Sequence, residues 1–117
     1  MALSKSVRPT SAGRSWSVGQ HVWAPWEPEL YFYPGVIKSV KDGKFHIHFD
    51  DGDEAWVSAA QMAEIELAVG QRVFARWQGG PGYFPATIDQ RQGDRIHVRY
   101  DDGDEEWTTI GRIRVER

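Results

Sequence analysis

The sequence predicts an all-β protein built of two tandem units, each of five short antiparallel strands. Three observations predict it. A 40-residue segment recurs after a shift of 51 residues without a gap. The 117 residues include 12 Gly and 6 Pro, which favour many turns over long helices. Apolar and polar residues alternate along each copy, which is the period of a strand with one buried face.

The repeat aligns residues 18–57 with residues 69–108. The first copy reads VGQHVWAPWEPELYFYPGVIKSVKDGKFHIHFDDGDEAWV, and the second reads VGQRVFARWQGGPGYFPATIDQRQGDRIHVRYDDGDEEWT. Fifteen of the 40 positions are identical, including Trp26/Trp77, Pro34/Pro85 and the Asp-Asp-Gly-Asp-Glu run. We therefore expect three parts: a flexible tail at 1–15, one unit at 16–67 and a second unit at 68–117.

The first half of each copy predicts two strands. A strand at Gln20–Trp26 alternates, with Val22, Ala24 and Trp26 on one face. After a turn-rich stretch, a second strand is expected at Tyr33–Ser39. The second copy repeats both strands, at Gln71–Trp77 and Phe84–Gln90.

The second half of each copy predicts a hairpin and a short closing strand. Phe45, Ile47 and Phe49 alternate with polar residues, as Ile96, Val98 and Tyr100 do in the second copy. The Asp-Asp-Gly-Asp run that follows is a hairpin turn, because Gly supplies a positive φ and Asp tolerates it. The remaining expected elements are strands at Glu54–Val57 and Glu105–Thr108, then a helical turn and a last strand near Glu64–Glu66 and Ile113–Glu116.

Five short strands per unit favour a small, strongly bent barrel, because closure removes exposed edges. A unit of this size buries little core and is only marginally stable alone. Leu67 and Ala68 are the only residues between the first unit's last strand and the second copy. We therefore expect the units to pack together or to share a strand, with Trp23 and Phe74 as candidate contacts.

Composition excludes several classes of protein. The chain has no Cys, which excludes a disulfide framework, a thiol nucleophile and a Cys-based zinc site. No apolar run approaches the roughly 18 residues of a membrane span, and none resembles a signal peptide. The formal charge is −3, and residues 18–117 carry 11 basic against 17 acidic residues, or −6. An acidic body favours a basic partner over nonspecific duplex binding.

The pattern Val-x-Ala-x-Trp, a turn, Tyr-Phe-Tyr-Pro-Gly and then Phe-Asp-Asp-Gly-Asp resembles the Tudor domains of the Royal superfamily, here in tandem. The resemblance covers residues 18–66 and 69–116. It implies two tandem five-stranded SH3-like barrels. It also implies that one end of a barrel carries an aromatic cage for methylated lysine or arginine.

The resemblance places the two cages at matching positions of the copies. The first cage consists of Trp26, Tyr33 and Phe49 as walls, with Asp51 and Asp53 at the rim. The second consists of Trp77, Phe84 and Tyr100 as walls, with Asp102 and Asp104 at the rim. Many methyl readers of the family carry another aromatic where Asp53 and Asp104 stand. Each cage therefore has three walls, unless Tyr31 or Trp56 adds a fourth to the first.

The chemistry of such a cage follows from its residue types. A methylammonium is a weakly hydrated cation, and each ring face in contact with it contributes about 0.5–2 kcal/mol. A rim carboxylate accepts the N–H of a mono- or dimethylated group. Three rings and one acid give about −4 to −7 kcal/mol, or a dissociation constant from about millimolar to about ten micromolar. Two linked ligands would add avidity.

The same residues also fit simpler roles. The aromatics can form a core or plug the end of a barrel, and the Asp-Asp-Gly-Asp-Glu runs can be solvated turns. They lack the terminal bidentate Glu of a twelve-residue calcium loop. His46 and His97 alternate with basic residues on what reads as a solvated outer face, so we expect no metal site and no cofactor.

The sequence therefore predicts a non-catalytic binding module. It shows no Ser/His/Asp arrangement and no phosphate-cradling Gly loop, so we do not expect an enzyme. The expected partner is a basic, methylated, histone-like protein tail, with the first cage as the principal site. The alternatives are a scaffold for an unmodified peptide, or a nucleic-acid module using Lys44, Arg95, Arg99 and the basic tail. We expect a monomer without membrane association, nuclear and chromatin-bound in a eukaryote and cytoplasmic otherwise.

Overall fold

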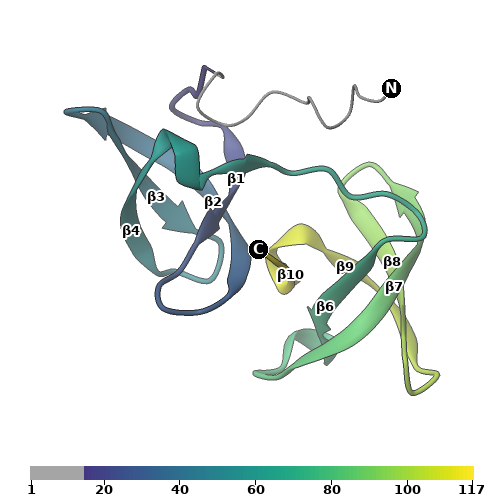
Figure 1. Cartoon of the computed structure of the whole chain (residues 1–117). Coiled ribbons are helices and arrows are strands. Elements are labelled where there is room, and N and C mark those ends of the chain that lie inside the picture. The colour runs from purple at the N-terminus through teal and green to yellow at the C-terminus, as the bar shows by residue number, and fades with distance from the viewer. Residues whose placement is uncertain (1–14) are drawn as a thin grey trace, which may run out of the picture.

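The computed structural model describes residues 15–117, which fold as an all-β, antiparallel structure (Figure 1). The first half contains β1 (His21–Pro25), β2 (Tyr31–Lys41), β3 (Lys44–Phe49), β4 (Glu54–Ser58) and β5 (Ala63–Glu64). The second half contains β6 (Arg72–Arg76), β7 (Tyr83–Gln92), β8 (Arg95–Tyr100), β9 (Glu105–Thr109) and β10 (Ile113–Glu116). The predicted tail at 1–15 lies outside the described residues except for Ser15.

The two halves pair their strands in the same way. β2, β3 and β4 are hydrogen-bonded in order, as are β7, β8 and β9. β1 pairs with β2 and β5, and β6 pairs with β7 and β10. Even the irregularities coincide, because the register shifts between Ile37 and Ser39 in one half and between Ile88 and Gln90 in the other. The aligned segments of the sequence therefore have matching strand pairings and matching register shifts.

The hairpin turns form where the Asp-Asp-Gly-Asp runs predict them. Gly52 and Gly103 both have φ +100°, in the left-handed region that Gly adopts without strain. The helical turn of each half comes earlier than expected, at Ala59–Gln61 and Ile110–Arg112, and β5 lies at Ala63–Glu64. A third 3-10 turn, at Trp77–Gly79, is present only in the second half of the described chain.

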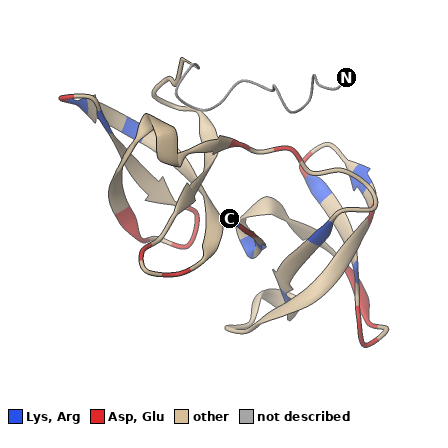
Figure 2. Cartoon of the chain, viewed as in Figure 1, with Lys and Arg blue, Asp and Glu red and all other residues tan. Residues whose placement is uncertain are grey.

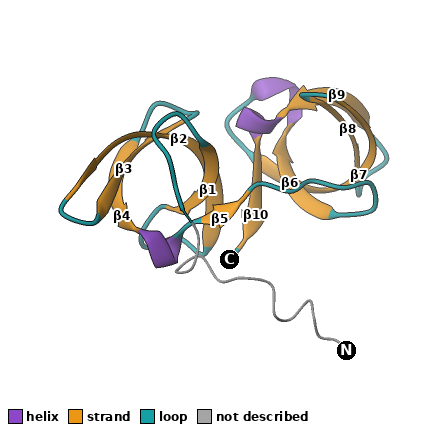
Figure 3. Cartoon of the chain, turned by 90° about the horizontal axis from the view of Figure 1, so that it is seen from above, coloured by secondary structure: helices purple, strands orange, loops and turns teal. Residues whose placement is uncertain are grey.

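Each half has its own apolar core, around which its strands curve (Figure 3). The first core includes the alternating residues Val22, Ala24, Ile37 and Ile47, all fully buried. The second includes their counterparts Val73, Ala75, Ile88 and Val98. Trp16, just before the first repeat, is 9% exposed and packs in the first core.

The halves share a strand and exchange side chains, as the short connection between them predicts. β10 pairs with β6 and also with β2, where Val115 lies opposite Phe32. Trp23 of β1 belongs to the core of the second half. The ring of Phe74 lies 5.5 Å from that of Tyr31.

No helix in the described part of the chain is long and apolar enough to cross a membrane.

Candidate functional site

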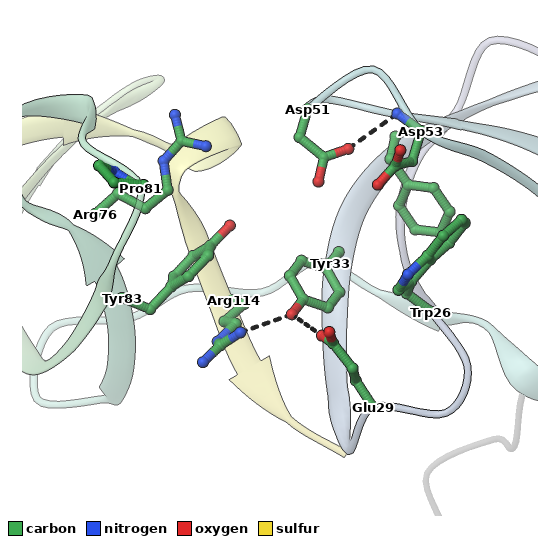
Figure 4. A pocket seen from close by; sticks show the side chains of 10 residues that line it. Trp26, Glu29, Tyr33, Asp51, Asp53, Arg76, Pro81, Tyr83 and Arg114 are labelled. Atoms are coloured by element: carbon green, nitrogen blue, oxygen red, sulfur yellow. Dashed lines mark hydrogen bonds between the residues drawn. The ribbon is translucent and has the colours of Figure 1, made fainter.

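A pocket of about 310 Å³ lies where the two halves meet (Figure 4). The first half contributes Trp26, Glu29, Tyr33, Phe49, Asp51 and Asp53 to its lining. The second half contributes Arg76, Pro81, Tyr83 and Arg114. The structure therefore brings the five residues of the first predicted cage together in one pocket, and adds a wall from the other half.

Two aromatic rings form a right-angled corner in this pocket. Trp26 follows the last residue of β1 and Phe49 ends β3, and their ring centroids lie 5.7 Å apart at an interplanar angle of 85°. The N–H of Phe49 donates to the carbonyl of Asp53 at 2.8 Å, which fixes the hairpin turn against the ring. A cation is attracted by the face of an aromatic ring, where the negative charge density lies.

Tyr33 forms the side of the pocket that faces the second half. Its hydroxyl donates to Glu29 and accepts a hydrogen bond from Nη1 of Arg114 at 2.7 Å. Burial and the bond to Glu29 raise the pKa of Tyr33 to about 12, so its phenol stays neutral. The hydroxyl of Tyr33 therefore bonds to two other lining residues of the pocket, Glu29 and Arg114.

The rim acid is held by its own turn. Asp51 Oδ1 accepts the N–H of Asp53 at 3.0 Å, so the carboxylate is oriented by the hairpin. Both acids are exposed and line the pocket. An oriented carboxylate beside a ring corner is the arrangement that would bind a methylated ammonium or guanidinium N–H.

The second half supplies a basic and aromatic wall. The guanidinium of Arg114 lies 3.7 Å from the ring centroid of Tyr31 and 4.1 Å from that of Tyr83. Arg76 lines the same wall. The ionised side chains of the lining are three carboxylates and two guanidiniums, so the pocket has a net charge of −1. That charge favours a cation.

A second, smaller pocket of about 90 Å³ lies on the second half alone. Its lining is the second predicted cage: Trp77, Phe84, Tyr100, Asp102 and Asp104. The rings of Trp77 and Tyr100 repeat the right-angled corner, at 5.5 Å and 87°. Asp102 Oδ1 accepts a hydrogen bond from the N–H of Asp104 at 3.0 Å, as Asp51 does from Asp53 in the first half. Phe84 is 51% exposed, whereas its counterpart Tyr33 is 8% exposed because the other half covers it.

Neither residue considered as a fourth wall lines the first pocket. Trp56 is half-exposed and stacks on His46, with centroids 4.8 Å apart. Tyr31 packs against Phe74 and Arg114. The additional ring is Tyr83, which the sequence reasoning missed. No signal within one copy could have found it, because it reaches the pocket through the contact between the halves.

The expected solvated face is wrong for His97, which is only 9% exposed. Its Nδ1 lies 2.5 Å from Asp89 Oδ1, and its Nε2 lies 3.5 Å from Glu105 Oε1. The hydrogen bond from His97 lowers the pKa of Asp89. Within residues 15–117 this is the one group of three His, Asp or Glu side chains close enough to hold a metal ion. The two ring nitrogens face different carboxylates: Nδ1 shares a hydrogen bond with Asp89, and Nε2 lies within ion-pair distance of Glu105.

The basic residues of the nucleic-acid alternative do not gather on one surface. Lys44 lies on β3 of the first half, whereas Arg95 and Arg99 lie on β8 of the second. Arg99 pairs with Asp89 at 3.4 Å, and Arg95 lies 5.5 Å from the ring centroid of Trp107. Figure 2 shows Lys and Arg spread over both halves, with acidic residues between them.

A protein-family model described as "Domain of unknown function (DUF4537)" matches residues 19–113. The chain belongs to this family. The DUF4537 match runs from Gly19 to Ile113, the first residue of β10. It therefore includes every lining residue of both pockets except Arg114. No curated protein matches the chain.

Several solved structures resemble the DUF4537 chain loosely. The tandem Agenet domains 3–4 of ADCP1 share 12% identity over 86% of this chain and 79% of that chain, with a TM-score of 0.40. The AGD34 structure of Arabidopsis thaliana AGDP1 shares 12% identity over 86% of this chain and 82% of that chain, with a TM-score of 0.41. The four MBT repeats of Drosophila melanogaster Sfmbt, in complex with the peptide RHR(me)KVLR, share 16% over 80% and 35%, with a TM-score of 0.33.

Proposed function

We propose that this chain is a tandem of two SH3-like, Tudor-type barrels, at residues 16–67 and 68–117, that binds a methylated lysine or arginine of a basic protein tail. The observation that carries this proposal is the pocket between the halves. There the perpendicular rings of Trp26 and Phe49 stand beside the oriented carboxylate of Asp51. The module is a non-catalytic reader, and its ligand in a eukaryote is a histone-like tail on chromatin.

Binding follows from desolvation and charge. A methylated cation loses little hydration on entering the ring corner, and each ring contact contributes about 0.5–2 kcal/mol. The carboxylate of Asp51 adds charge attraction and accepts an N–H where methylation leaves one. The net charge of −1 on the lining is neutralised by one such cation. An affinity between about millimolar and about ten micromolar is expected.

The second pocket is a smaller version of the same site. Trp77, Tyr100 and Asp102 repeat the corner and the oriented acid, but the cavity of about 90 Å³ has no wall from the other half. We therefore assign the principal site to the first pocket. The second would add avidity to a doubly methylated tail.

The proposal is tested by an amide-resolved NMR titration of the whole chain. The probes are one basic peptide carrying unmodified, mono-, di- or trimethylated lysine, and its dimethylarginine equivalent. We expect shifts centred on Trp26, Phe49 and Asp51 that grow with methylation. Trp26→Ala should abolish them.

Trp56→Ala is the matched control, because it removes an exposed tryptophan of the same half that lies outside the pocket. It should leave binding unchanged. Absence of shifts at millimolar peptide, or shifts independent of methylation, would refute the reader. Binding of an oligonucleotide that weakens steeply with salt and survives Trp26→Ala would favour the nucleic-acid alternative.

A further inference from the structure

Arg76 is a guanidinium of the first pocket that the binding of a cation does not use. Its Nη2 donates to the carbonyl of Gly79 at 3.3 Å, and its Nε is buried without a hydrogen-bond partner. No carboxylate of the described residues pairs with it. By contrast, Arg72, four residues earlier on the same strand, pairs with Asp101 at 2.6 Å. Arg76 therefore retains hydrogen-bonding capacity and charge at the pocket wall.

Tyr83 places a second donor beside Arg76. The two residues lie directly opposite each other in the pairing of β6 with β7, so both are held by regular strands. Their side chains interact, and burial raises the pKa of Tyr83, which keeps the proton on its hydroxyl. In Figure 4 the hydroxyl of Tyr83 and the guanidinium of Arg76 stand on the wall across from Asp51. Two adjacent donors held by paired strands are suited to bind an anion.

The repeat provides an internal comparison. The counterparts of Arg76 and Tyr83 in the first copy are Pro25 and Phe32, which also lie opposite each other. Neither side chain can donate a hydrogen bond. The donor pair therefore belongs to the second half alone, and it faces the ring corner of the first half across the shared pocket.

We infer that the pocket reads a methylated residue together with an anionic group of the same peptide, whose carboxylate or phosphate binds the Arg76 guanidinium and the Tyr83 hydroxyl. This inference rests on the proposed reader function and specifies its ligand. The recognised segment carries a cation for Trp26, Phe49 and Asp51 and, a few residues away, an acid for the opposite wall. A uniformly basic tail would place further positive charges near Arg76, which would repel its guanidinium.

The test is an isothermal titration of the whole chain with methylated peptides that differ at one position. Starting from the methylated peptide that the titration above selects, Ala, Glu or phosphoserine is placed at each of the three positions on either side of the methylated residue. We expect an acid at one of these positions to tighten binding by about 3- to 10-fold, since charge-assisted hydrogen bonds are stronger than neutral ones. Glu and phosphoserine distinguish the two sources of the anion.

Arg76→Gln should remove the gain from the acid, so that the variant binds the acidic peptide and the Ala peptide with similar affinity. Lys41→Gln is the control, since it removes one positive charge from an exposed position outside the pocket. It should preserve the gain.

Three results would overturn the inference while leaving the reader intact: no position at which an acid tightens binding, a gain that persists in Arg76→Gln, or an equal loss for the acidic and Ala peptides. A failure of the proposed function itself appears differently. In that case the Ala peptide does not bind at any methylation state, and Trp26→Ala changes nothing.

Discussion

The buried imidazole of His97 links three neighbouring strands through its side-chain contacts. It lies on β8, and it contacts Asp89 on β7 and Glu105 on β9. Its counterpart His46 contacts Glu54, but Lys38 stands where Asp89 would be. Within the described residues the three-residue group is therefore complete only in the second half, where one hydrogen bond and one ion-pair contact surround a buried imidazole.

The bond to His97 predicts a pH-dependent contribution of Asp89 to stability. The folded pKa of Asp89 is lowered from 3.8, so its contribution is present above the unfolded pKa and is lost as pH falls through the folded pKa. Asp89→Asn should lower the free energy of unfolding by about 0.5–1.5 kcal/mol at neutral pH. Urea unfolding at a series of pH values should show this difference shrinking below pH 3.8.

Asp94→Asn is the control, because this acid lies exposed in the turn between β7 and β8. It should change stability little at any pH. A difference for Asp89→Asn that is constant from neutral to acidic pH would show that the carboxylate charge does not matter.

At the scale of the elements, the contact between β2 and β3 in the first half and the contact between β7 and β8 in the second half are packed with different residues. A Cβ added to Gly35 would lie 2.6 Å from Ile47 Cγ2 and 3.1 Å from the backbone of β3. The repeat counterparts of Gly35 and Ile47 are Ala86 and Val98, both fully buried. The first half thus combines the smaller residue, Gly35, with the larger one, Ile47. The second half combines the larger Ala86 with the smaller Val98. This exchange keeps the packed volume nearly constant.

Gly35→Ala should therefore destabilise the first half by about 1–3 kcal/mol through overpacking. Ile47→Val alone should cost about 0.5–1.5 kcal/mol. In the double variant the two losses should be less than additive, because the smaller side chain that Ile47→Val introduces relieves part of the clash. Chemical denaturation of the three variants measures this coupling. Strict additivity would mean that the strain comes from the backbone contact alone.

The elements and most of the site could be predicted because they follow from local patterns. Alternation set the strands, and Gly52 and Gly103 set the hairpin turns. The resemblance to Tudor domains grouped Trp26, Phe49 and Asp51, and these three side chains line one pocket. Helical turns were misplaced by several residues, since nothing in their short sequences fixes their bounds.

The remaining residues of the site depend on how the halves meet. Tyr83, Arg76 and Arg114 reach the pocket because β10 pairs with β2, where Val115 lies opposite Phe32. That register depends on side chains from both halves, including Trp23 in the second core. No periodicity within one copy encodes it. The sequence therefore predicts two similar cages, whereas the first cage lies in a pocket lined by both halves and the second in a pocket lined by one half.

At the scale of the whole molecule, Arg114 predicts coupled unfolding of the halves. It stacks on Tyr31 and Tyr83 and donates to Tyr33, so it contacts both sides of the junction. Arg114→Gln should cost about 1–3 kcal/mol in unfolding free energy. Unfolding followed by fluorescence and by circular dichroism should give one shared transition in the parent chain.

Arg95→Gln is the matched control, because Arg95 lies over Trp107 within the second half. It should leave the transition nearly unchanged. Two separate transitions in the parent chain, or equal effects of the two arginine variants, would show that the junction does not couple the halves.

The pairing of β10 with β2 also has a consequence for biosynthesis. During translation the first half leaves the ribosome with one edge of β2 unpaired near Phe32, because its partner Val115 belongs to β10, which is synthesised after β1 to β9. An unpaired edge of this kind can pair with a neighbouring nascent chain. Mispairing between neighbouring nascent chains is therefore favoured until β10 has emerged, and the similar strand patterns of the two halves make a second copy of this chain a suitable partner.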